Sequence, residues 1–151
     1  MKAIKQFQVR GIPGEVSRVE IAGRTIDYWA PASGSDSLLI AHDGQNVFDG
    51  KTSTHRRRTW ELGQSVNRVS HDLGISPPAL IAVWNGNSKA DPWARVKELS
   101  PEKVFKNNVR PVSDSVIPIT PDDLYGDRYL TQIFTQYIPE ILDEVNVRTT
   151  P

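Results

Sequence analysis

Two short, uninterrupted apolar runs constrain the fold of this chain more than any other feature of its sequence. The first covers Leu38–Ala41 and the second Ala79–Trp84, and polar or turn-forming residues bound each of them. Continuous apolar runs of this length are typical of strands that are covered on both faces, as in a parallel sheet. Between them, apolar residues at helical spacing predict an amphipathic helix, with one face formed by Leu62, Val66, Val69 and Leu73. The sequence therefore predicts a β-α-β unit with a right-handed crossover.

The helix and an earlier hairpin have recognisable end signals. Thr59 is predicted as the N-cap of the helix, and Gly74 stands where a C-terminal cap belongs. Before the first apolar run, Val16–Ile21 and the stretch 24–30 alternate apolar and polar residues on either side of Ala22-Gly23. This alternation predicts an antiparallel hairpin with one face on the core.

The carboxyl-terminal part divides into an irregular segment and a helix. From residue 85 to 123 only a short helix at 101–105 is indicated, and a long irregular insertion in a compact domain is usually a lid or a binding loop. A broad apolar stripe over 129–142 predicts a final helix, with a kink at Pro139. We therefore expect an α/β fold in which an antiparallel hairpin precedes a β-α-β-α unit with parallel strands.

Composition narrows the function classes. A length of 151 residues predicts a single domain, and a formal net charge of zero gives no general attraction to nucleic acid or to a membrane surface. Without cysteine there are no disulfides, thiol nucleophiles or Cys-ligated metals. No apolar run is long enough for a signal peptide or a membrane span, so we expect a cytoplasmic protein.

Common catalytic and cofactor motifs do not occur in the sequence. The nearest relative of a Gly-x-Ser-x-Gly elbow, around Ser65, falls inside the predicted helix, and no phosphate-binding loop follows a strand. The spacing of the three histidines, at 42, 55 and 71, matches no metal motif, so we predict neither a metal nor a cofactor. His42, next to Asp43 at a strand end, is interpreted as shaping the loop, with general base catalysis as the alternative. The run Arg56-Arg57-Arg58 is interpreted as a solvated loop, because no aromatic platform accompanies it.

Four stretches of the sequence occur in the order found in one enzyme family. They are His42-Asp43-Gly44-Gln45-Asn46-Val47-Phe48-Asp49, the strand end Val83-Trp84-Asn85-Gly86-Asn87, the motif Arg95-x-x-Glu98-Leu99-Ser100-Pro101, and Ile138-Pro139-Glu140-Ile141 in the last helix. In these stretches the chain resembles the putative-esterase (esterase D, enterochelin esterase-like) family of α/β-hydrolases, with Leu99 in place of the usual aromatic residue. The resemblance covers the amino-terminal half of that family's domain.

The resemblance implies a fold and an incomplete site. It implies an incomplete α/β-hydrolase fold, with the Ala79–Trp84 strand between the hairpin and Leu38–Ala41. It assigns the Gln45 backbone N–H to an oxyanion hole, with Gly44 letting the backbone approach the substrate. By the same resemblance the loop residues His42, Asp43 and Asn46, together with Arg95, bind a small-molecule ester or shape the loop that does. The serine nucleophile and the acid and histidine of the triad follow later in the family, and no residue here matches them.

These implications lead to alternative functions. The first is an amino-terminal portion of a serine carboxylic-ester hydrolase, inactive as these residues alone. The second is a non-catalytic α/β interaction domain that forms homo-oligomers through the open sheet edge at Leu38–Ala41. A third, a small nucleotide-binding domain, is disfavoured because the chain has no phosphate loop.

Overall fold

The computed structural model describes residues 1–86, 90–103 and 119–145, in two compact units. The first unit contains residues 1–84 and the chain from Ile138 onward, and the second contains residues 85–137. The expectation of a single domain stays a prediction, and the helix predicted at 101–105 lies partly outside the described residues.

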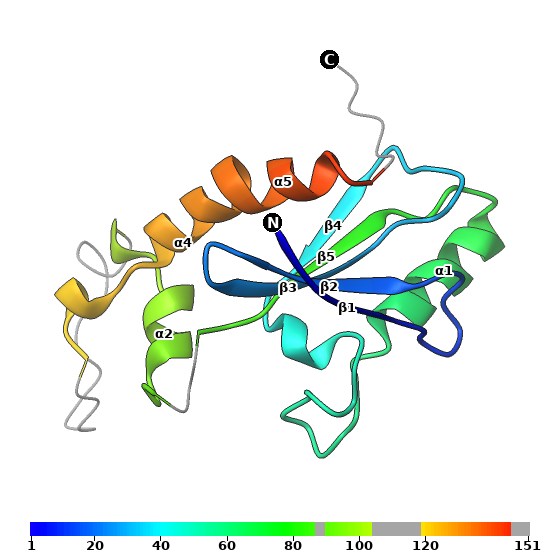
Figure 1. The fold of residues 1–151 in the computed structure, drawn as a ribbon. Helices are drawn as coiled ribbons and strands as arrows, with labels where there is room; N and C mark the ends of the chain where they lie inside the picture. The colour runs from blue at the N-terminus through cyan, green and yellow to red at the C-terminus, as the bar shows by residue number, and fades with distance from the viewer. Residues whose placement is uncertain (87–89, 104–118, 146–151) are drawn as a thin grey trace. The chain divides into compact units, whose positions relative to one another are not determined.

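A mixed five-stranded sheet forms the centre of the first unit, so the fold is α/β (Figure 1). Its strands stand in the order β1-β2-β3-β5-β4, in which β4 and β5 are parallel and the other neighbours are antiparallel. Their bounds are Lys2–Phe7 (β1), Val16–Ile21 (β2), Arg24–Trp29 (β3), Leu38–Ala41 (β4) and Ala79–Val83 (β5). The predicted hairpin and the predicted parallel pair are both confirmed. The strand that the resemblance placed between hairpin and first apolar run does lie there.

The two apolar runs differ in burial because they occupy different places in the sheet. All five residues of β5 are buried, as expected for a strand with a neighbour on each side. All four residues of β4 are only half-buried, since β4 is the last strand in the order. The prediction that both strands are covered on both faces is therefore wrong for β4.

Helix α1, Leu62–Leu73, connects β4 to β5 and packs on one face of the sheet. Its residues Leu62 and Val66 contact a buried cluster made by Ile12, Val16, Trp29, Val47, Phe48, Leu80 and Ala82. The helix ends at Gly74, which has a left-handed backbone with φ 66°, as predicted. Its N-cap is Glu61 and not Thr59, so that prediction is wrong. The reason is tertiary: the Trp60 N–H donates to the Asn46 carbonyl at 2.9 Å and holds the preceding chain in a loop.

The remaining helical segments are short. In the described residues they include α2 (Ala94–Leu99), the 3₁₀ turn η2 (Pro121–Asp123), α4 (Gly126–Gln132), the π-helical segment η3 (Ile133–Tyr137) and α5 (Ile138–Leu142). In place of one kinked helix over 129–142, the chain changes from α to π and back to α. The widened segment ends at Tyr137, two residues before Pro139, whose ring nitrogen has no hydrogen to donate to the preceding turn.

Candidate functional site

The loop that follows β4 is the candidate site, and it is more buried than the strand before it. His42 is half-buried, whereas every residue from Asp43 to Phe48 is buried. Asp43 has a left-handed backbone, with φ 53° and ψ 41°, and this reversal starts the 3₁₀ turn η1, Gly44–Asn46. The polar loop therefore folds back onto the sheet at the carboxyl end of β4, where open α/β sheets place their ligands.

Gly44 allows this loop to lie directly on β5. A Cβ atom added at Gly44 would stand 2.4 Å from the carbonyl carbon and 2.4 Å from the oxygen of Ala82, and 2.8 Å from the carbonyl carbon of Val83. These neighbours are backbone atoms of a central strand, so they have no freedom to move aside. The structure thus gives the glycine a packing reason, in addition to the role toward substrate that the resemblance assigns.

Hydrogen bonds within the η1 turn, and one from Thr52, fix the backbone of the turn. Within it, the Asn46 N–H donates to the Asp43 carbonyl at 3.0 Å and the Val47 N–H donates to the Gly44 carbonyl at 3.1 Å. Gln45 is only 6% exposed, and its backbone carbonyl accepts the Thr52 hydroxyl at 2.9 Å. The assignment of the Gln45 backbone N–H to an oxyanion hole stays a prediction.

Asn46 connects the turn to the segment that follows it. Its side-chain Oδ1 accepts the Thr54 N–H at 2.9 Å and the Thr54 hydroxyl at 3.0 Å, and its carbonyl accepts Trp60. Asn46 is only 2% exposed, so its role is to stabilise the loop through these hydrogen bonds.

The Arg95 motif lies in the second unit and divides into an exposed and a buried residue. Arg95 is exposed on α2, whereas Glu98 is fully buried and accepts the Gly86 N–H at 2.7 Å through Oε2. Glu98 thus fastens the chain after β5 to α2. The role of Arg95 toward a substrate stays a prediction.

A buried charge cluster beside the sheet is a feature that the sequence reasoning missed. Arg18 on β2 makes two hydrogen bonds to Asp27 on β3, at 2.6 and 2.8 Å, and both residues are buried. Asp49, the last residue of the resembling octet, lies 3.5 Å from Arg18 and accepts Lys5 at 3.0 Å. The Arg18 guanidinium also lies over the rings of Phe7, at 5.1 Å, and Trp84, at 4.5 Å. The ion pair between Asp49 and Arg18 therefore joins the octet to the hairpin.

Two local signals position this cluster. The two-residue turn Ala22-Gly23 fixes Arg18 directly opposite Asp27 in the hairpin. On β1 the register shifts between Ala3 and Lys5, so an extra residue turns the Lys5 side chain to the same side as Arg18. The pairing of Arg18 with Asp27 could be predicted from the sequence, because each residue lies on the same face of its strand as a buried apolar residue.

Burial and charge act differently on the two carboxyl groups. Burial raises the pKa of Asp27 above its ordinary value, and this effect exceeds the lowering by Arg18. Burial also acts to raise the pKa of Asp49, but hydrogen bonds from the Lys51 backbone and from Lys5 outweigh it, so that pKa is lowered.

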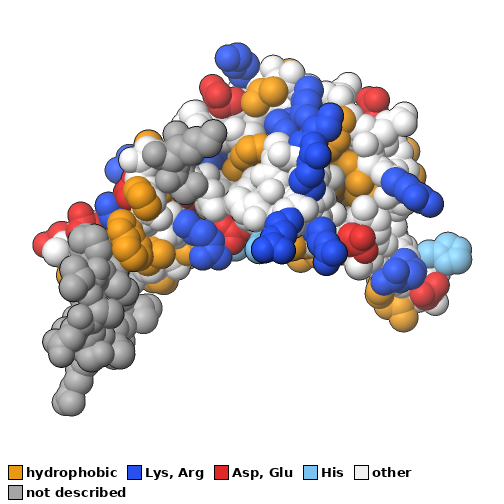
Figure 2. Space-filling model, turned by 90° about the horizontal axis from the view of Figure 1, so that it is seen from below, with side chains coloured by type: hydrophobic (Ala, Val, Ile, Leu, Met, Phe, Trp, Pro, Cys, Tyr) orange, Lys and Arg blue, Asp and Glu red, His pale blue; other side chains and the backbone are white. Residues whose placement is uncertain are grey.

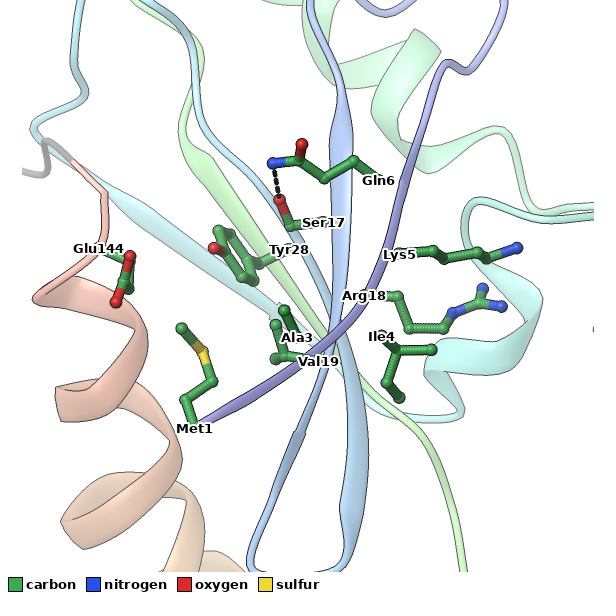
Figure 3. Close-up of a pocket in the computed structure, with 10 residues that line it drawn as sticks. All are labelled: Met1, Ala3, Ile4, Lys5, Gln6, Ser17, Arg18, Val19, Tyr28 and Glu144. Carbon is green, nitrogen blue, oxygen red and sulfur yellow. Dashed lines mark hydrogen bonds between the residues drawn. The ribbon is translucent and has the colours of Figure 1, made fainter.

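A hollow of about 530 Å³ lies along β1 and β2 and is separate from the loop after β4. Figure 3 shows Met1, Tyr28 and Glu144 on one side of β1, and Lys5 and Arg18 on the other. The polar pair inside it, Gln6 and Ser17, is already joined by a hydrogen bond of 3.3 Å.

Other classes of site have no support in the described residues. Across residues 1–86, 90–103 and 119–145, no group of three His, Cys, Asp or Glu side chains is arranged to hold a metal ion. In the same ranges no helix has the length and apolar character needed to cross a membrane. Comparison of the chain with known protein families, curated proteins and solved structures gave no match.

Proposed function

We propose that this chain forms the amino-terminal part of an esterase-like α/β-hydrolase domain, in which the loop after β4 supplies one donor to an oxyanion hole. The sequence resemblance of His42–Asp49 motivates the proposal. One structural observation carries it: β5 lies between β3 and β4, and the η1 turn at the end of β4 packs against β5. This strand order is the one that the resemblance implies for an α/β-hydrolase.

The chemistry assigned to the loop is electrostatic. In a serine esterase, the attacking hydroxyl adds to the ester carbonyl and places negative charge on its oxygen. A backbone N–H from the Gln45 position and another from the residue after the nucleophile stabilise that charge. Since no residue of this chain matches the nucleophile or its partners, we expect residues 1–151 alone to be inactive.

The test compares two variants that both remove the Gln45 side chain, and only one of them also removes the backbone donor. In the full gene product that contains these residues, Gln45→Pro removes the N–H, while Gln45→Ala keeps it and serves as the matched control. With p-nitrophenyl acetate, the proline variant should lose about 10²- to 10³-fold in kcat and the alanine variant should stay within about threefold of wild type. Circular dichroism of both variants checks that they fold.

Two results contradict the proposal. One is equal turnover by the wild type and a folded Gln45→Pro variant. The other is turnover by residues 1–151 alone that disappears on Ser65→Ala. Ser65 lies inside α1 and its N–H donates to the Glu61 carbonyl at 2.9 Å, which disfavours it as a nucleophile.

A second candidate is a non-catalytic interaction domain. It is favoured by the position of β4, which pairs only with β5 among the described residues and leaves its other edge open. The association state of the chain tests it.

A further inference from the structure

The segment after the η1 turn has a strained backbone at two arginines. Arg56 has φ 50° and Arg57 has φ 67°, both in the left-handed region, although neither is glycine. Residues with side chains avoid this region because Cβ approaches the following carbonyl oxygen. Strain of this kind persists only where neighbouring structure imposes it, and it is concentrated at functional sites.

Specific contacts hold the strained segment in place. A Cβ atom on Gly50 would stand 2.5 Å from the Arg57 carbonyl oxygen, so only glycine lets the two parts of the loop meet. The Arg58 N–H donates to the His55 carbonyl at 3.0 Å. The hydrogen bonds from Thr52, Thr54 and Trp60 to Gln45 and Asn46 then fasten the whole segment to the candidate oxyanion turn.

The segment presents three cations and an aromatic ring to solvent. Arg56, Arg57 and Arg58 are all exposed, and within the part of the chain that the structure describes their guanidinium groups make no ion pair or hydrogen bond. Trp60 is 46% exposed, and the ring of His55 lies 6.4 Å from it. The segment runs along the lower side of Figure 1, the side seen in Figure 2, where Lys and Arg side chains gather. The interpretation of these arginines as a solvated loop agrees with their exposure, and the structure adds an exposed ring, Trp60, in the same segment.

We propose that Arg56, Arg57, Arg58 and Trp60 form an anion-recognition rim, which binds a negatively charged, ring-bearing part of the ester substrate. This inference rests on the proposed function, since it places the rim beside the reacting carbonyl. Guanidinium groups pair with carboxylates and phosphates through planar, bidentate hydrogen bonds, and an indole ring stacks on flat ligands. A small anion fits better than a nucleic acid, because the chain as a whole has a formal net charge of zero.

A binding experiment tests the rim directly on residues 1–151. The probe is benzene-1,2,4-tricarboxylate, with its uncharged trimethyl ester as the ligand control, followed by calorimetry. Changing all three arginines to glutamine should weaken binding about tenfold or more, and raising the salt to about 0.5 M should weaken wild-type binding as well. Trp60→Leu should weaken binding about threefold to tenfold by removing the stacking surface. Arg68→Gln, an exposed arginine on α1, is the matched protein control and should bind as wild type does.

A kinetic experiment then separates the rim from the oxyanion donor. In the full gene product, the triple glutamine variant should raise KM for mono-p-nitrophenyl succinate about tenfold and leave KM for p-nitrophenyl acetate unchanged. If Gln45→Pro leaves turnover intact while tricarboxylate binding still depends on the arginines, the proposed function fails and the anion site remains. Equal binding by wild type and triple variant overturns the rim. Tighter binding of a single-stranded oligonucleotide than of the tricarboxylate also overturns it, in favour of a nucleic-acid surface.

Discussion

The backbone of β5 leaves no room for a side chain at Gly44. We predict that Gly44→Ala lowers the free energy of unfolding by about 1 to 3 kcal/mol or more, because its Cβ would overlap Ala82 and Val83 backbone atoms. For a domain of this size, each kcal/mol corresponds to about 2 to 4 °C in melting temperature. Thermal and urea unfolding measure the change.

Gly14→Ala is a comparison variant with a different cost, because Gly14 has a left-handed backbone and Gly44 does not. Gly14 has φ 76° but no atom within 4 Å of an added Cβ, so the variant isolates the cost of backbone strain. A Gly44→Ala protein as stable as wild type would show that the loop lies further from β5 than described.

The charge cluster predicts opposite pH dependences for its two carboxyl groups. Because the pKa of Asp27 is raised above 3.8, the folded state binds more protons than the unfolded state between 3.8 and the raised pKa. The contribution of Asp27 to the free energy of unfolding therefore decreases as the pH rises through this window. Asp27→Asn should remove this decrease. Because the pKa of Asp49 is lowered, its contribution is present above 3.8 and is lost as the pH falls through the lowered pKa.

Urea unfolding of wild type, Asp27→Asn and Asp49→Asn at pH values from about 3 to 6 measures these slopes. Relative to wild type, the Asp27 variant should gain stability toward higher pH and the Asp49 variant should lose it. The same sign of change in both variants would mean that Arg18, and not burial, determines the pKa of Asp27.

Among the elements, those with strong local signals were predictable. The hairpin follows from alternation and a two-residue turn, and β5 follows from an apolar run that is covered on both sides. The strand β1 was missed because five of its six residues are exposed, so its pairing with β2 and not its own pattern makes it a strand. Secondary structure that depends on a partner carries little signal in its own sequence.

At the helix boundaries and at the candidate site, too, some features follow from the local sequence and others depend on contacts with distant residues. Gly74 was predictable as a cap because a left-handed residue favours glycine, whereas the start of α1 depends on the bond from Trp60 to Asn46. The buried stripe of the last helix advances by four residues at a time through the π segment and consists of Tyr129, Ile133, Tyr137 and Ile141. Leu130 and Phe134 are exposed, although the predicted α-helical stripe included them.

At the site, the loop was predictable from its octet. The packing of Gly44 and the Arg18 cluster came from contacts between distant parts of the chain.

On the scale of the whole molecule, β4 pairs only with β5 among the described residues, so its other edge is open there. The Ala79 N–H donates to the Ser37 carbonyl at 2.9 Å, so odd-numbered residues of this strand direct their backbone groups toward β5. By the alternation of a strand, Leu38 and Ile40 direct theirs to the open edge. An open, apolar edge is a template for another strand.

We predict that residues 1–151 alone associate through this edge and that Ile40→Pro reduces the association. Proline removes an N–H that faces outward and leaves the hydrogen bonds to β5 intact, whereas Leu39→Pro, the positional control, removes a bond to β5 and should destabilise the sheet. Light scattering coupled to size exclusion should give a mass above 16.9 kDa for the wild type and a lower mass for Ile40→Pro. A sharp monomeric peak with a cooperative melt for the wild type would contradict the prediction. It would mean that the half-buried side chains of β4 suffice to protect its edge, and the interaction-domain candidate would lose the observation that favours it.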